Sequence, residues 1–117
     1  MARSVRYIRR GVHGRIRENF VWDIMSARSV VHITAAEVKF GTTQVHQDPP
    51  PRAQDFYYHL GDASVWVSNI GPHRNEFIGA VGGVEYHLHV DFDSPIDVAI
   101  TITVEDDLPL EIQGYEQ

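Results

Sequence analysis

The chain has 117 residues, no cysteine and a formal net charge of −6. This length fits one ordinary domain that buries enough apolar surface to fold. The absence of cysteine excludes disulfide bonds, thiol catalysis and zinc sites with thiolate ligands, so a metal would need histidine and carboxylate ligands. No apolar run approaches the roughly 20 residues of a membrane-spanning helix, and the start lacks an apolar signal-peptide core. We expect a soluble protein without a membrane span, located in the cytoplasm or released without a signal peptide.

The charges are divided unevenly along the chain. Six arginines precede Glu18, the first acidic residue, whereas the rest of the chain carries four basic and 16 acidic residues. We interpret residues 1–18 as a basic, flexible N-terminal arm and residues 19–117 as a single β-sandwich domain. The alternatives for the arm are an edge strand at Val5–Ile8 and an unstructured extension. Because an acidic body repels phosphate, nucleic acid is expected to bind only through the arm, if at all.

The first half of the body predicts strands and one stiff connector. Phe20–Trp22 is predicted to be a short strand, and Ser29–Phe40 is rich in β-branched residues. The apolar phase of the second segment changes near Ala35 and Ala36, which predicts a β-bulge. The prolines at 49–51 lack backbone donors and predict a connector outside the sheets.

Apolar and polar residues also alternate in the second half of the chain. This period of two predicts strands at Gln54–Leu60 and Ala63–Ile70, with a turn between them. A further short strand is predicted at Glu76–Val81, before two glycines. A last edge strand is predicted at Leu108–Ile112.

The longest alternating stretch runs from Val84 to Glu105 and predicts one hairpin with a turn at residues 93–95. In the register that this turn sets, Phe92 faces Ile96, and each apolar residue of one arm meets an apolar residue of the other. Closely spaced turn signals without a helical period predict an all-β, antiparallel β-sandwich. A jelly-roll-like arrangement and a small barrel are the alternatives.

Histidines and carboxylates alternate along the first arm of this hairpin. The same-face residues are Glu85, His87, His89 and Asp91. A His-x-His pair on a strand with a nearby carboxylate is a chelating pattern for a divalent metal, as in a cupin-like enzyme. No histidine follows His89 to complete such a site, and a solvent-facing strand surface is the simpler explanation of the pattern. We therefore expect no cofactor, with a divalent metal ion as the alternative.

An aromatic and polar group is the second candidate site. If Val65 and Val67 point into the core, Trp66 points outward between two serines, and exposed rings of this kind stack on the apolar faces of sugars. The alternative is that Trp66 belongs to the core. Trp22 is expected in the core. The predicted ligand-binding residues are Trp66, Tyr57, His59, Asp62, Asn69, His73, Arg74 and Asn75.

These patterns favour a non-enzymatic binding module whose partner is a carbohydrate or another small surface ligand. No serine lies in a nucleophile-elbow sequence, and no complete catalytic set is visible, which argues against an enzyme. The small metal-dependent enzyme is one alternative function. A subunit of a homo-oligomer, assembled through the basic arm or a sheet edge, is the other.

Overall fold

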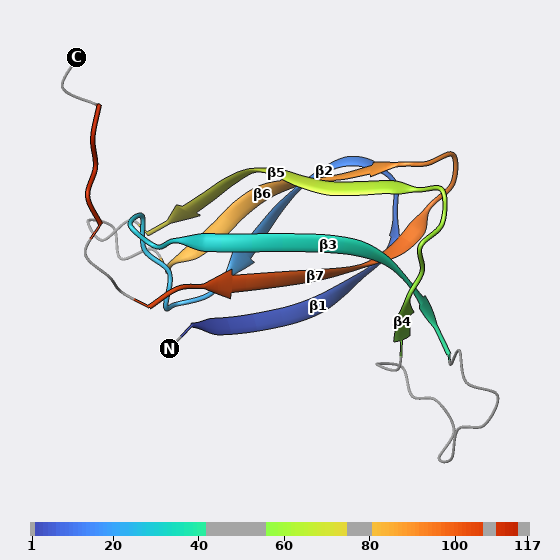
Figure 1. Ribbon diagram of the computed structural model, residues 1–117, viewed down its shortest axis with the longest axis horizontal. Helices are drawn as coiled ribbons and strands as arrows, with labels where there is room; N and C mark the ends of the chain where they lie inside the picture. The colour runs from blue at the N-terminus through green and yellow to red at the C-terminus, as the bar shows by residue number, and fades with distance from the viewer. Residues whose placement is uncertain (1, 42–55, 75–80, 107–109, 115–117) are drawn as a thin grey trace.

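The computed structural model describes residues 2–41, 56–74, 81–106 and 110–114 (Figure 1). Within these residues the chain forms strands and no helix. The strands are β1 (Arg3–Val12), β2 (Gly14–Val21), β3 (Val31–Phe40), β4 (Phe56–Tyr58), β5 (Ser64–His73), β6 (Gly83–Asp91) and β7 (Ile96–Val104).

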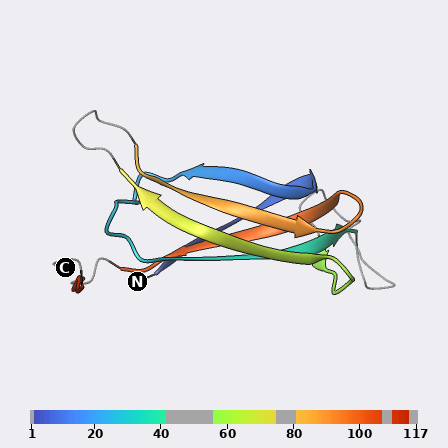
Figure 2. The same cartoon turned by 90° about the horizontal axis from the view of Figure 1, so that it is seen from above.

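The strands make two antiparallel sheets that pack face to face. One sheet has the order β1-β7-β3-β4 and the other has the order β2-β6-β5. Seen from above, β2, β6 and β5 lie over β1, β7 and β3 (Figure 2). The predicted all-β sandwich is confirmed. The barrel alternative is wrong because each sheet ends in two edge strands and the sheets do not close on one another.

The strands β6 and β7 do not form the predicted hairpin. β6 pairs with β2 and β5, whereas β7 pairs with β1 and β3, so residues 92–95 cross from one sheet to the other. Each strand carries one apolar row. Side by side in a hairpin, both rows would lie on one face and would still need a covering layer. Facing each other across the sandwich, the two rows cover one another.

The core is built mainly from these two apolar rows. Leu88 of β6 and Ile100 of β7 are completely buried, and Trp22 packs against the cluster from its margin, as expected. The buried members are Val12, Met25, Val84, Tyr86, Leu88, Val90, Ile96, Val98, Ile100, Ile102 and Val104.

Residues 3–12 and 14–21 are strands of the two sheets, which corrects the interpretation of residues 1–18 as a flexible arm. β1 pairs with β7 from Arg3 to Val12, and β2 pairs with β6 from Gly14 to Val21, so no boundary falls at residue 18. The physical reason is that apolar side chains alternate with the arginines and pack against the core. Gly11 and Gly14 have φ values of 64° and 76°, which glycine adopts without strain, where the chain turns from β1 into β2.

The strand β3 corrects a second detail. Its register with β7 runs without interruption from Val31 to Val38, so the bulge predicted near Ala35 is absent. The apolar phase changes because Val38 is buried on the outer side of the sheet, where it pairs with Tyr58 of β4. Register shifts occur instead in β1, between Arg9 and Val12, and in β5, between Ser68 and Gly71.

Several predicted elements lie partly or wholly outside the described residues. They are the proline connector at 49–51, residues 54–55 of the strand predicted at Gln54–Leu60, the strand at residues 76–81 except Val81, and the start of the predicted strand at 108–112. The described part of that last segment, residues 110–112, is not in a strand.

A tyrosine pair joins the two sheets inside the sandwich. The hydroxyls of Tyr7 (β1) and Tyr86 (β6) are hydrogen-bonded to each other, and Tyr7 also stacks on Phe20 with ring centroids 5.2 Å apart. Burial raises the pKa of Tyr86, and the hydrogen bond to Tyr7 raises it further. Burial also raises the pKa of Tyr7. Both phenols therefore stay neutral in the fold at pH values where an exposed tyrosine ionises.

We predict that the free energy of unfolding falls as pH rises above about 10, where tyrosines of the unfolded chain ionise and the buried pair does not. Urea denaturation at about pH 7 and about pH 11 measures this loss. The double variant Tyr7→Phe/Tyr86→Phe should lose less stability between the two pH values than the unmodified protein. Tyr86→Phe alone should cost about 1–3 kcal/mol at neutral pH, because the Tyr7 hydroxyl loses its partner. An unchanged pH dependence in the double variant would contradict the assignment.

The strand order makes a cross-linking prediction, for which the cysteine-free chain is a clean background. Ser4 and Thr103 are directly opposite in the β1–β7 register, with their hydroxyl oxygens 2.7 Å apart. Opposite residues of an antiparallel pair have Cα atoms roughly 4.5–5.5 Å apart, which suits a disulfide. Ser4→Cys/Thr103→Cys should therefore cross-link within one chain on oxidation, as measured by loss of free thiol and by peptide mass spectrometry.

The matched control for this variant is Asp91→Cys/Asp97→Cys. A β6–β7 hairpin would place these two residues opposite each other, whereas here they belong to different sheets. The control should keep both thiols free as a monomer. Efficient cross-linking of the control, without cross-linking of the first pair, would show that the strand order is wrong.

Candidate functional site

The outer surface of the three-stranded sheet carries charged, histidine, amide, hydroxyl and indole side chains from all three of its strands. β6 is its central strand, and the outward row of β6 alternates with residues that are buried in the core. Outward side chains of β2 and β5 flank that row. We call this surface the polar sheet face, and its residues are Arg15, Arg17, Asn19, Ser64, Trp66, Ser68, His73, Glu85, His87, His89 and Asp91.

The centre of the polar sheet face is a stack of two rings. Trp66 of β5 lies opposite His89 of β6, and the rings are parallel within 2° at a centroid distance of 4.7 Å. Ser68 Oγ lies 2.7 Å from His89 Nε2, and this hydrogen bond fixes the imidazole. The His87 ring meets His89 edge-on, with centroids 6.2 Å apart. Trp66 is still 46% exposed, so the indole is held in place and open to solvent.

Each outward side chain of this part of β6 also has a neighbour on β2. Arg15 is opposite His89 and Arg17 is opposite His87, so Arg15, His89 and Trp66 form one line across three strands. Since neighbouring strands are about 4.8 Å apart, the backbones of Arg15 and Trp66 are separated by roughly 10 Å. Arg15 is exposed and has no ion-pair partner among the residues that the structure describes.

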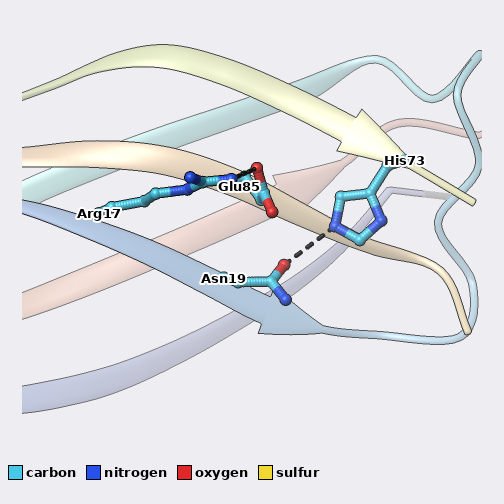
Figure 3. A network of polar contacts seen from close by, with 4 residues as sticks. All are labelled: Arg17, Asn19, His73 and Glu85. Carbon is cyan, nitrogen blue, oxygen red and sulfur yellow. Dashed lines mark hydrogen bonds and ion pairs between the residues drawn. The ribbon is translucent and has the colours of Figure 1, made fainter.

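A second polar network lies towards one end of the face (Figure 3). Arg17 Nη2 donates to Glu85 Oε2 at 2.9 Å, and His73 Nε2 lies 2.9 Å from Asn19 Oδ1. These contacts tie the two edge strands of the sheet to each other and to β6. They hold the outer side chains in defined positions, which favours binding over a surface of freely rotating groups.

The structure separates the ligand-binding residues that were predicted as one group. Tyr57 lies on β4 in the other sheet, opposite Lys39, and His59 and Asp62 follow β4 as exposed residues. Asn69 lies in the bulge of β5 with a φ of 56°. These residues do not form one cluster, because residues that are close in sequence extend along β5. Seven residues of strand cover roughly 23 Å between Trp66 and His73.

Two further members of that group lie at the far end of β5. His73 joins the polar sheet face through Asn19. Arg74 has a structural contact instead, because its guanidinium donates to the backbone carbonyls of Asp23 and Met25. Asn75 lies outside the described residues. Of the eight predicted residues, Trp66 and His73 are therefore on the polar sheet face.

The proposed metal ligands share one face as predicted, but they do not gather around one point. No group of three or more histidine and carboxylate side chains in the described residues is arranged to hold a metal ion. Same-face residues on one strand are roughly 7 Å apart, so neighbouring strands must supply further ligands. Here those strands place Arg15, Arg17 and Trp66 beside the histidines, and Glu85 is already paired with Arg17.

The residues of this face that were not predicted as site residues are Arg15, Arg17, Asn19, Ser64 and Ser68. The first three were assigned to the arm or its margin. Their signal is present in the sequence, because Ile16 and Phe20 alternate with them and both pack against the core. The arginines were interpreted as a flexible arm, although the alternation of apolar and polar residues in the same segment predicts a strand.

Comparisons with protein-family models, with characterised proteins and with solved structures found no match. In the described part of the chain, no helix has the length and apolar content needed to cross a membrane. The geometry of the polar sheet face is therefore the observation from which a function can be inferred.

Proposed function

We propose that this protein is a non-enzymatic binding module that recognises a carbohydrate on the polar sheet face. The observation that carries the proposal is the Trp66 ring, which is 46% exposed and stacked on His89. Stacking covers one side of the indole with the imidazole and leaves the other side for a ligand. An exposed indole of fixed orientation offers the flat apolar surface on which the C–H groups of a sugar ring pack.

Polar groups around the ring supply the hydrogen-bonding partners that a polyhydroxylated ligand needs. Ser64 and Ser68 flank Trp66 on the same strand, and His87 lies diagonally across on β6. Hydroxyl and imidazole groups both donate and accept hydrogen bonds, as sugar hydroxyls do. Because the stack and the hydrogen bond between Ser68 and His89 hold Trp66 and His89 in place, little side-chain freedom remains to be lost on binding.

The metal-dependent alternative draws less support from the same surface. Its four ligands are spread along one strand, and Arg17 neutralises Glu85. A binding role uses the features that are present together, namely a fixed ring, adjacent hydroxyls and a rigid sheet. We therefore place the binding module first.

The variant Trp66→Ala should lose binding to the carbohydrate that the unmodified protein selects on a glycan array, with affinity measured by isothermal titration calorimetry. Its free energy of unfolding should fall by no more than about 1 kcal/mol, because the ring is half exposed and loses mainly its stack with His89. Trp66→Phe should keep part of the affinity, since a smaller flat ring remains.

The matched control is Tyr58→Ala. Tyr58 is 52% exposed, similar to Trp66, but it belongs to β4 in the opposite sheet. This variant should bind the carbohydrate as the unmodified protein does. Equal losses in both variants, or a loss of several kcal/mol of stability for Trp66→Ala, would refute the assignment of the site.

A further inference from the structure

The first two strands, which carry six arginines, lie on one side of the sandwich. β1 and β2 are edge strands of different sheets. They lie on the same side of the sandwich, as the stacking of Tyr7 of β1 on Phe20 of β2 shows. All six arginines that precede the first acidic residue belong to these two strands. We call this side the basic edge, and its arginines are Arg3, Arg6, Arg9, Arg10, Arg15 and Arg17.

Acidic residues neutralise only part of the basic edge. Three of the arginines have acidic partners: Arg9 with Glu18 at 2.7 Å, Arg10 with Asp97 at 3.8 Å and Arg17 with Glu85 at 2.9 Å. The other three, Arg3, Arg6 and Arg15, have no acidic partner in the described residues. Arg3 and Arg6 instead lie over the rings of Trp22 and Tyr58. Three of the six arginine charges are therefore left without an acidic partner in the described residues, on a protein of net charge −6.

Arg15 is the point at which the basic edge meets the polar sheet face. Arg15 lies in line with His89 and Trp66. The next outward residue of β6 after His89 is Asp91, which is exposed. The open side of the indole faces away from His89, because His89 covers the other side. A glycan with one sugar stacked on that open side would therefore pass over the outer edges of the two rings and bring a group on a following sugar to Arg15. A guanidinium at that place favours a carboxylate or sulfate, which it binds with two parallel hydrogen bonds.

We propose that the ligand of the polar sheet face is an anionic glycan, whose sugar ring stacks on Trp66 and whose carboxylate or sulfate binds Arg15. This inference rests on the proposed carbohydrate-binding function and adds the charge of the ligand. An anionic glycan fits better than a nucleic acid, because closely spaced phosphates would be repelled by a body of net charge −6. A glycan with a single carboxylate or sulfate per several sugars carries fewer charges along its length than a nucleic acid and offers ring faces for the indole.

The experiment is a glycan array that contains neutral, uronic-acid-containing, sialylated and sulfated oligosaccharides, together with a single-stranded oligonucleotide as a comparison probe. The selected glycan is then titrated against four proteins: the unmodified protein, Arg15→Gln, Arg15→Lys and Arg3→Gln. Arg3→Gln is the matched control because it removes one unneutralised charge from the same basic edge, away from Trp66. The same titrations with a carboxyl-reduced or desulfated form of the glycan separate a carboxylate from a sulfate contact.

We expect selection of anionic glycans and at least about tenfold weaker binding for Arg15→Gln, since hydrogen bonds to charged groups contribute that much. Arg15→Lys should recover part of the loss, Arg3→Gln should change the affinity little, and added salt should weaken binding. Selection of neutral glycans, or equal losses for Arg15→Gln and Arg3→Gln, would overturn this inference and leave the proposed function standing. No glycan binding at all would overturn both, and binding of the oligonucleotide in preference to every glycan would replace them with a nucleic-acid site.

Discussion

The structure depends on the burial of two apolar rows against each other, one from β6 and one from β7. Their residues include the completely buried Leu88 and Ile100, and the two strands are consecutive in sequence but belong to different sheets. Burial of apolar area is the main favourable contribution to folding, and it does not depend on backbone pairing between the rows. Each strand therefore remains free to pair with two other strands, and this arrangement makes a sandwich in place of a single hairpin.

The position of β6 also explains the candidate site. Because β6 is central in a three-stranded sheet, its outward histidines have a neighbour on each side. β5 supplies the indole that stacks on His89, and β2 supplies Arg15. The polar sheet face is thus the outer side of the same strand whose inner side builds the core. A change in the register of β6 would alter both sides together.

The first two strands show how charge and alternation combine in one segment. Their apolar residues join the core, while their arginines either pair with acidic residues of the body or remain on the surface. Exposed ion pairs contribute little to stability, so the packing of residues such as Val5 and Phe20 holds these strands in place. Arg15 has no acidic partner in the described residues, and this is the basis for the proposed anionic ligand.

The sequence by itself determined the fold class, most strand positions and the side of β6 that carries histidines, because a period of two is a local property of the chain. It also offered two positions for Trp66, exposed or in the core, and the ring is exposed in the structure. Which strands pair was decided only in the tertiary structure, since apolar rows that match in a hairpin match equally well across a sandwich. That choice brought Arg15 of β2 into line with His89 and Trp66, a juxtaposition of residues distant in sequence that no local pattern contains.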